Sequence, residues 1–73
     1  METLRPGMVK TIYDRVKNHM YQMRASTINR WMIIKFLVQE GYDQYEVEES
    51  LDLLQYEASL IFEPHVGQLA LVK

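Results

Sequence analysis

Residues 60–72 read LIFEPHVGQLALV, in which two short apolar runs are separated by the segment PHVG at residues 64–67. On each side of this break the side chains alternate with a period of two, which is the pattern of a β-strand, and Pro and Gly are common turn residues. We therefore predict a β-hairpin over about residues 59–72 with a turn of about four residues. Because the chain has only 73 residues, one face of this hairpin must cover the preceding helices.

The segment directly before the hairpin, DQYEVEESLDLLQYE at residues 43–57, predicts an acidic helix. Its apolar residues Val47, Leu51 and Leu54 recur at the spacing of one helix face. Asp43 is a typical N-cap, and Glu46 three residues later resembles a capping box. All six charged residues in this segment are acidic.

Two further helices are predicted in the first forty residues. Pro6 and Gly7 indicate a start, and the helix over about residues 7–23 has an apolar stripe of Val9, Ile12, Tyr13, Val16 and Met20. Ser26 or Thr27 can cap a second helix over about residues 27–40, which Gly41 ends. Its centre, WMIIKFLV, is apolar on nearly every side except at Lys35, so a strand is the alternative for this run.

Composition excludes several classes of protein. The chain has no cysteine, which excludes a disulfide, a thiolate metal site and a cysteine nucleophile, and it has no apolar run long enough to cross a bilayer. We expect one domain over residues 1–73, with no membrane, cofactor or small-molecule substrate, in the cytoplasm or nucleus. His19 and His65 lack the partners of a catalytic triad or a metal site, so we expect no enzyme activity.

The predicted order of helix, capped helix, tight turn, helix and hairpin is similar to a small α+β winged helix-turn-helix, with three helices followed by a C-terminal β-hairpin wing. Residues 41–57, GYDQYEVEESLDLLQYE, and the hairpin resemble the C-terminal winged-helix domain of archaeal minichromosome maintenance helicases, in which an acidic helix with spaced leucines precedes a strand reading roughly Ile-Tyr-Glu-Pro. This resemblance implies a role in DNA replication. Ala58-Ser59 and His65-Val66 differ from the glycine and the basic wing turn common in that family.

Charge is divided unevenly along the chain. Residues 1–39 hold seven of the eight Lys and Arg residues, whereas residues 40–73 hold eight of the ten Asp and Glu residues. An acidic third helix would be repelled by DNA phosphates instead of releasing counterions. Candidate nucleic-acid contacts are therefore the bases of the first two helices and the wing histidine: Lys10, Arg15, Lys17, Arg24, Arg30, Lys35 and His65. The alternative is that these are solvated charges on helix faces.

The apolar excess of the second helix predicts a surface that needs cover. We expect a homodimer or a docking groove there, because large exposed apolar patches usually mark interfaces. The candidate contact residues for a protein partner come from the second helix and the acidic third helix: Trp31, Ile33, Phe36, Leu37, Glu46, Glu49 and Asp52. The sequence thus favours a non-catalytic interaction module, and the alternative is a small DNA-binding transcriptional regulator that uses the basic residues and the wing.

Overall fold

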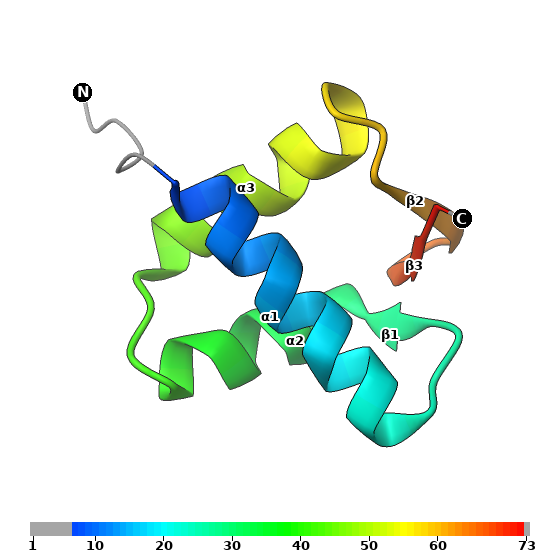
Figure 1. The fold of residues 1–73 in the computed structure, drawn as a ribbon, viewed down its shortest axis with the longest axis horizontal. Coiled ribbons are helices and arrows are strands. Elements are labelled where there is room, and N and C mark those ends of the chain that lie inside the picture. The colour runs from blue at the N-terminus through cyan, green and yellow to red at the C-terminus, as the bar shows by residue number, and fades with distance from the viewer. Residues whose placement is uncertain (1–6, 73) are drawn as a thin grey trace.

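The computed structural model describes residues 7–72, which form three helices and a three-stranded antiparallel sheet (Figure 1). Pro6, part of the predicted start of the first helix, lies outside the described residues. In chain order the elements are α1 (Met8–Met23), β1 (Ile28–Asn29), α2 (Arg30–Gln39), α3 (Gln44–Tyr56), β2 (Ile61–His65) and β3 (Gln68–Leu71). The strand order in the sheet is β1-β3-β2, so the last strand of the chain, β3, lies between the other two. This α+β arrangement is compatible with a winged helix.

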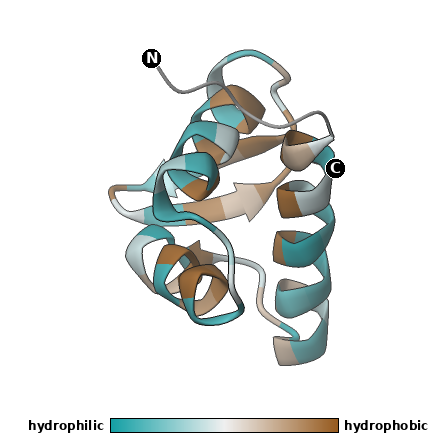
Figure 2. Cartoon of the chain, turned by 90° about the vertical axis from the view of Figure 1, so that its left-hand side faces the viewer, coloured by the Kyte–Doolittle hydropathy of each residue, from teal (hydrophilic) through white to brown (hydrophobic). Residues whose placement is uncertain are grey.

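The core lies where the three helices meet the inner face of the sheet. The predicted stripes of α1 and α3 are confirmed, because Ile12, Val16 and Met20 are buried, as are Val47, Leu51 and Leu54. In Figure 2, the side of α1 that faces the rest of the domain is brown and its outer side is mostly teal. The other elements add their own buried residues to this core: Ile33, Ile34, Leu37, Ile61 and Leu69.

The second helix begins later than predicted. Ile28 and Asn29 are not helical but form β1, which pairs with Leu69 and Gln68 of β3. The cap is Asn29, whose side-chain oxygen accepts a hydrogen bond from the backbone N–H of Met32 at 3.0 Å. The predictions of a helix from residue 27 and of a cap at Ser26 or Thr27 were therefore wrong. Pairing with a distant strand holds these residues extended, and local helical spacing cannot reveal such a pairing.

The hairpin is confirmed, but its turn is shorter than predicted. Strand β2 extends through His65, which pairs with Gln68, so only Val66 and Gly67 connect the strands. Between Phe62, which pairs with Ala70, and His65 the register shifts by one residue. Pro64 lies in this bulge, where its missing N–H costs no ladder hydrogen bond. Thus Pro64 interrupts the ladder without ending the strand.

The third helix agrees closely with its prediction. It spans Gln44–Tyr56, and the Asp43 side chain accepts a hydrogen bond from the backbone N–H of Glu46 at 3.0 Å. The helix ends where the backbone N–H of Ala58 donates to the Leu53 carbonyl and Ser59 adopts a φ of 56°. This left-handed residue turns the chain from α3 into β2.

Candidate protein-binding cleft

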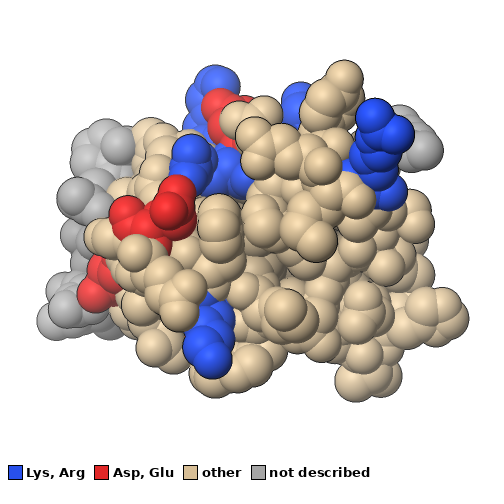
Figure 3. All heavy atoms as spheres, turned by 90° about the horizontal axis from the view of Figure 1, so that it is seen from below, with Lys and Arg blue, Asp and Glu red and all other residues tan. Residues whose placement is uncertain are grey.

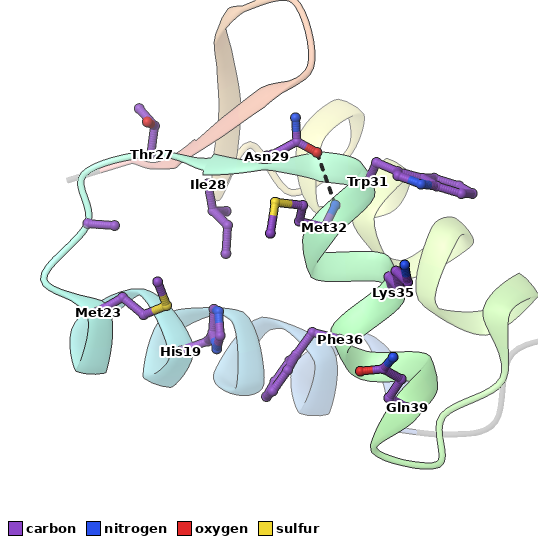
Figure 4. Close-up of a pocket in the computed structure, with 11 residues that line it drawn as sticks. His19, Met23, Thr27, Ile28, Asn29, Trp31, Met32, Lys35, Phe36 and Gln39 are labelled. Carbon is purple, nitrogen blue, oxygen red and sulfur yellow. Dashed lines mark hydrogen bonds between the residues drawn. The ribbon is translucent and has the colours of Figure 1, made fainter.

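An apolar cleft of about 600 Å³ opens between the C-terminal half of α1, β1 and the outer side of α2 (Figure 4). In Figure 4, Met23 and His19 extend from α1 into the gap, and Met32, Phe36 and Ile28 reach into it from the opposite side. Trp31 stands at the rim and points away from the interior of its own cleft. The lining is completed by small and polar side chains: Ala25, Thr27, Asn29, Lys35 and Gln39.

Backbone hydrogen bonds before and after β1 position the walls of the cleft. Helix α1 ends at Met23 and is followed by the C-cap Arg24, which has a φ of 53°, and the backbone N–H of Ala25 donates to the Met20 carbonyl at 3.0 Å. The chain then crosses to the sheet, where the backbone N–H of Arg30 donates to the Gly67 carbonyl at 2.8 Å. The start of α2 is thus tied to the hairpin and held away from the end of α1.

The opposite end of the cleft is closed by an aromatic contact. The rings of His19 and Phe36 lie with centroids 4.3 Å apart and planes tilted by 36°. Both residues are half-buried, so they connect α1 and α2 without filling the space between them. The remaining opening is bordered by large apolar side chains with most of their area in solvent: 63% for Met23, 63% for Trp31 and 66% for Met32.

These exposed side chains form a substantial apolar surface. Met23, Trp31 and Met32 lie close together around one opening, and clustered exposed apolar side chains often mark an interface, whereas singly scattered ones do not. A thioether side chain also adapts its shape to a partner and makes favourable contacts with aromatic rings. The cleft therefore has the size and chemistry of a binding surface for apolar side chains.

The outer face of α2 is a ridge between two hollows. Trp31, Lys35 and Gln39 are spaced four residues apart, and all three border both the cleft and a second hollow of about 310 Å³. The far side of this second hollow is lined by Ile34, Val38 and Gln44. Rows of side chains at this spacing are the ridges that pack into the grooves of another helix.

The surroundings of the cleft are poor in negative charge. None of the described residues that line the two hollows is acidic, and Lys35 is the one Lys or Arg among them. The view from below in Figure 3 shows a broad uncharged area, with blue side chains along its upper edge and at the lower left and red ones at the left and at the top. Binding of an apolar partner here would therefore remove little water from charged groups of the cleft.

Only some of the predicted protein-contact residues lie at the surface. Trp31 and Phe36 line the cleft, whereas Ile33 and Leu37 are fully buried in the core and offer no surface to a partner. A turn of 100° per residue places Ile33, Ile34 and Leu37 on one side of α2, which the apolar run alone did not reveal. On α3, Glu46 is only 8% exposed, so it offers little surface to a partner. Glu49 and Asp52 are half-buried and lie outside the cleft.

The predicted nucleic-acid contacts are not assembled into one basic surface. Lys10 pairs with Asp14 at 3.0 Å, Arg15 with Glu40, and Arg30 with Asp52 at 3.2 Å. The Lys17 ammonium lies 5.4 Å from the centre of the Tyr13 ring. The other three, which are exposed, are distributed over the end of α1, the outer face of α2 and the hairpin: Arg24, Lys35 and His65.

Most cleft residues escaped the sequence prediction, among them Met23, Ile28, Asn29 and Met32. Met23, Ile28 and Asn29 belong to the end of α1 and to β1, which helical spacing did not connect with α2. Met32 belongs to the apolar run of α2, from which its neighbour Trp31, and not Met32, was predicted as a protein contact. The apolar excess of that run was the available signal, but only the folded chain shows which of its residues lie outward.

No cluster of metal-ligating side chains is found among residues 7–72. No group of three or more His, Asp or Glu side chains is placed to hold a metal ion there. No helix in the same range is both long and apolar enough for a membrane span. Comparison with known proteins does not add a function, because the chain matches no protein-family model, no curated protein and no solved structure significantly. The resemblance to the helicase domain therefore rests on residues 41–72 alone.

Proposed function

We propose that this chain is a non-catalytic winged-helix module that binds protein surfaces through the cleft between α1 and α2. The observation that carries the proposal is the exposure of Met23, Trp31 and Met32 around one open apolar cavity. A domain this small has little apolar area to spare, so leaving these side chains in water is costly unless a partner covers them. The resemblance of residues 41–72 adds a setting in DNA replication to the proposal.

Electrostatics favours a protein over duplex DNA as the partner. The helix before the hairpin is the usual DNA-reading element of a helix-turn-helix, and here its six charged residues from Asp43 to Glu57 are all acidic. Three of the predicted basic contacts are already paired with carboxylates. Because binding to a polyanion depends on cations that neutralise phosphates, this distribution does not favour a DNA-binding regulator.

Photo-crosslinking tests the proposal at the cleft itself. A photoreactive benzoylphenylalanine replaces Met32, which is 66% exposed in the cleft, and the chain is irradiated in its source cells. The matched control carries the same group at Tyr56, which is 72% exposed at the end of α3 and outside the cleft. We expect a discrete protein adduct from position 32 that is absent or much weaker from position 56. No adduct from position 32 would refute the proposal.

A DNA-binding measurement tests the alternative. The fluorescence anisotropy of a labelled duplex is followed at low and physiological salt with the original chain and with a variant carrying alanine at Arg24, Arg30 and Lys35. We expect weak binding that disappears at physiological salt. Tight binding that persists there and is lost in the variant would favour the DNA-binding regulator instead.

A further inference from the structure

The proposed function does not say which protein occupies the cleft. The shape of α2 limits which surfaces can fit there. The ridge of Trp31, Lys35 and Gln39 lies beside the cleft on the same helix face. A two-fold symmetric interface requires that one surface carry both the projection and the recess that receives it. The outer side of α2 fulfils this requirement, because its most prominent apolar side chain points out of its own cleft (Figure 4).

We infer that the cleft is occupied by α2 of a second copy of this chain, in a two-fold dimer in which Trp31 of each copy enters the cleft of the other. This inference rests on the proposed function and identifies its partner. In the dimer, the indole of one copy contacts the Met23 and Met32 thioethers and the Phe36 ring of the other, a set of contacts favourable for an aromatic side chain. Ridges spaced four residues apart thereby pack into the grooves of a like helix.

Charge is compatible with this packing. Lys35 lies on the ridge four residues from Trp31, so its ammonium can lie against the face of the indole that enters from the partner. None of the described residues that line the two hollows carries a carboxylate, so dimerisation does not remove water from a carboxylate there. Arg30 and Asp52 already neutralise each other at the start of the ridge. The dimer therefore buries no unpaired acidic group from the two hollows.

The available area also fits a small dimer. A stable interface needs about 800 Å² from each partner. The chain exposes 5166 Å² in total, so a surface of that size is a modest part of it. The exposed Met23, Trp31 and Met32 side chains would form its apolar centre, and polar residues around the cleft form the rim that such interfaces usually have. A dimer of this size should form reversibly, so its population should depend on the concentration of the chain.

Sedimentation analysis of the purified chain tests the inference. The mass is measured from low micromolar to near millimolar concentration, together with the emission of Trp31, the one tryptophan of the chain. We expect the mass to rise from 8.7 kDa towards twice that value, with a blue shift of the emission over the same range. Trp31→Glu should raise the dissociation constant roughly tenfold or more, because a central aromatic anchor is lost.

Two further variants keep the outcome interpretable. Tyr56→Glu makes the same change from an aromatic to an acidic residue outside the cleft and should dimerise like the original chain. Met32→Glu retains Trp31 as a probe and should also weaken dimerisation; it replaces Trp31→Glu if that variant loses its far-ultraviolet circular dichroism. A mass that stays at 8.7 kDa throughout, or a dimer that Trp31→Glu and Met32→Glu leave intact, would overturn the inference.

The failure of this inference can be separated from that of the proposed function. Crosslinking from position 32 gives an adduct of twice the chain mass if the occupant is a second copy. An adduct of any other mass, from a chain that remains monomeric, means that the cleft binds a different protein, which overturns the dimer and retains the proposed function. The absence of any adduct contradicts both.

Discussion

Arg30 at the start of α2 donates a hydrogen bond to Asp52 in the middle of α3, with 3.2 Å between the guanidinium nitrogen and the carboxylate oxygen. The arginine side chain is 26% exposed and the aspartate side chain 48% exposed. One predicted DNA contact and one predicted protein contact thus neutralise each other. Their pairing joins the two helices on the side of α2 that faces α3.

This ion pair should contribute little to stability because about half of the aspartate side chain is exposed to solvent, which screens the attraction. We expect a coupling free energy below about 1 kcal/mol in a double-mutant cycle of Arg30→Ala and Asp52→Ala. The unfolding free energies are obtained from urea denaturation followed by circular dichroism. If the two substitutions were strictly additive, the pair would make no contribution in solution.

The cap of α2 gives a sharper test of the start of that helix. Asn29→Ala removes the acceptor of the Met32 N–H and should lower the unfolding free energy by about 1 kcal/mol. Ser26→Ala, at an exposed residue that the sequence favoured as the cap, should change it by less than about 0.5 kcal/mol. Urea midpoints at an unchanged slope compare the two. A larger loss from Ser26→Ala would place the cap there instead.

The hairpin turn depends on the left-handed conformation of Gly67. Its φ is 80°, and its backbone N–H donates to the Glu63 carboxylate at 2.7 Å. Gly67→Ala should destabilise the domain by about 1 to 2 kcal/mol, because a Cβ is disfavoured in this conformation. Val66→Ala is the control, since Val66 is 99% exposed and should change stability by less than about 0.5 kcal/mol. Equal thermal midpoints for the two variants would contradict the assigned turn.

Ser50 is a polar residue in the core whose replacement should stabilise the domain. It is fully buried in α3, and its hydroxyl has no hydrogen-bond partner among the described residues. Ser50→Ala should raise the unfolding free energy by about 1 kcal/mol, since it removes an unsatisfied hydroxyl and increases helix propensity. Urea denaturation measures the change, and Ser26→Ala is again the exposed control. A loss of stability would show that the hydroxyl is hydrogen-bonded in solution.

Local patterns of the sequence were sufficient for the elements whose contacts lie within one segment. The stripe of α1, the Asp43 cap and the buried face of α3 follow from spacing and capping, which act over a single helix. The hairpin was predictable for the same reason, because its strands are neighbours in the chain. Its turn length was not, because the bulge at Pro64 depends on how β2 pairs with β3.

The sequence by itself determined that a chain of this length has more apolar surface on α2 than one helix face can bury, and that its negative charge gathers on α3. Only the tertiary structure decided that Ile33 and Leu37 face the core while Trp31 and Met32 face outward. The reason is that α2 is apolar almost all round, so its rotation is set by contacts with distant elements. Those contacts, β1 with β3 and Arg30 with Gly67, also separate α2 from the end of α1 and create the cleft.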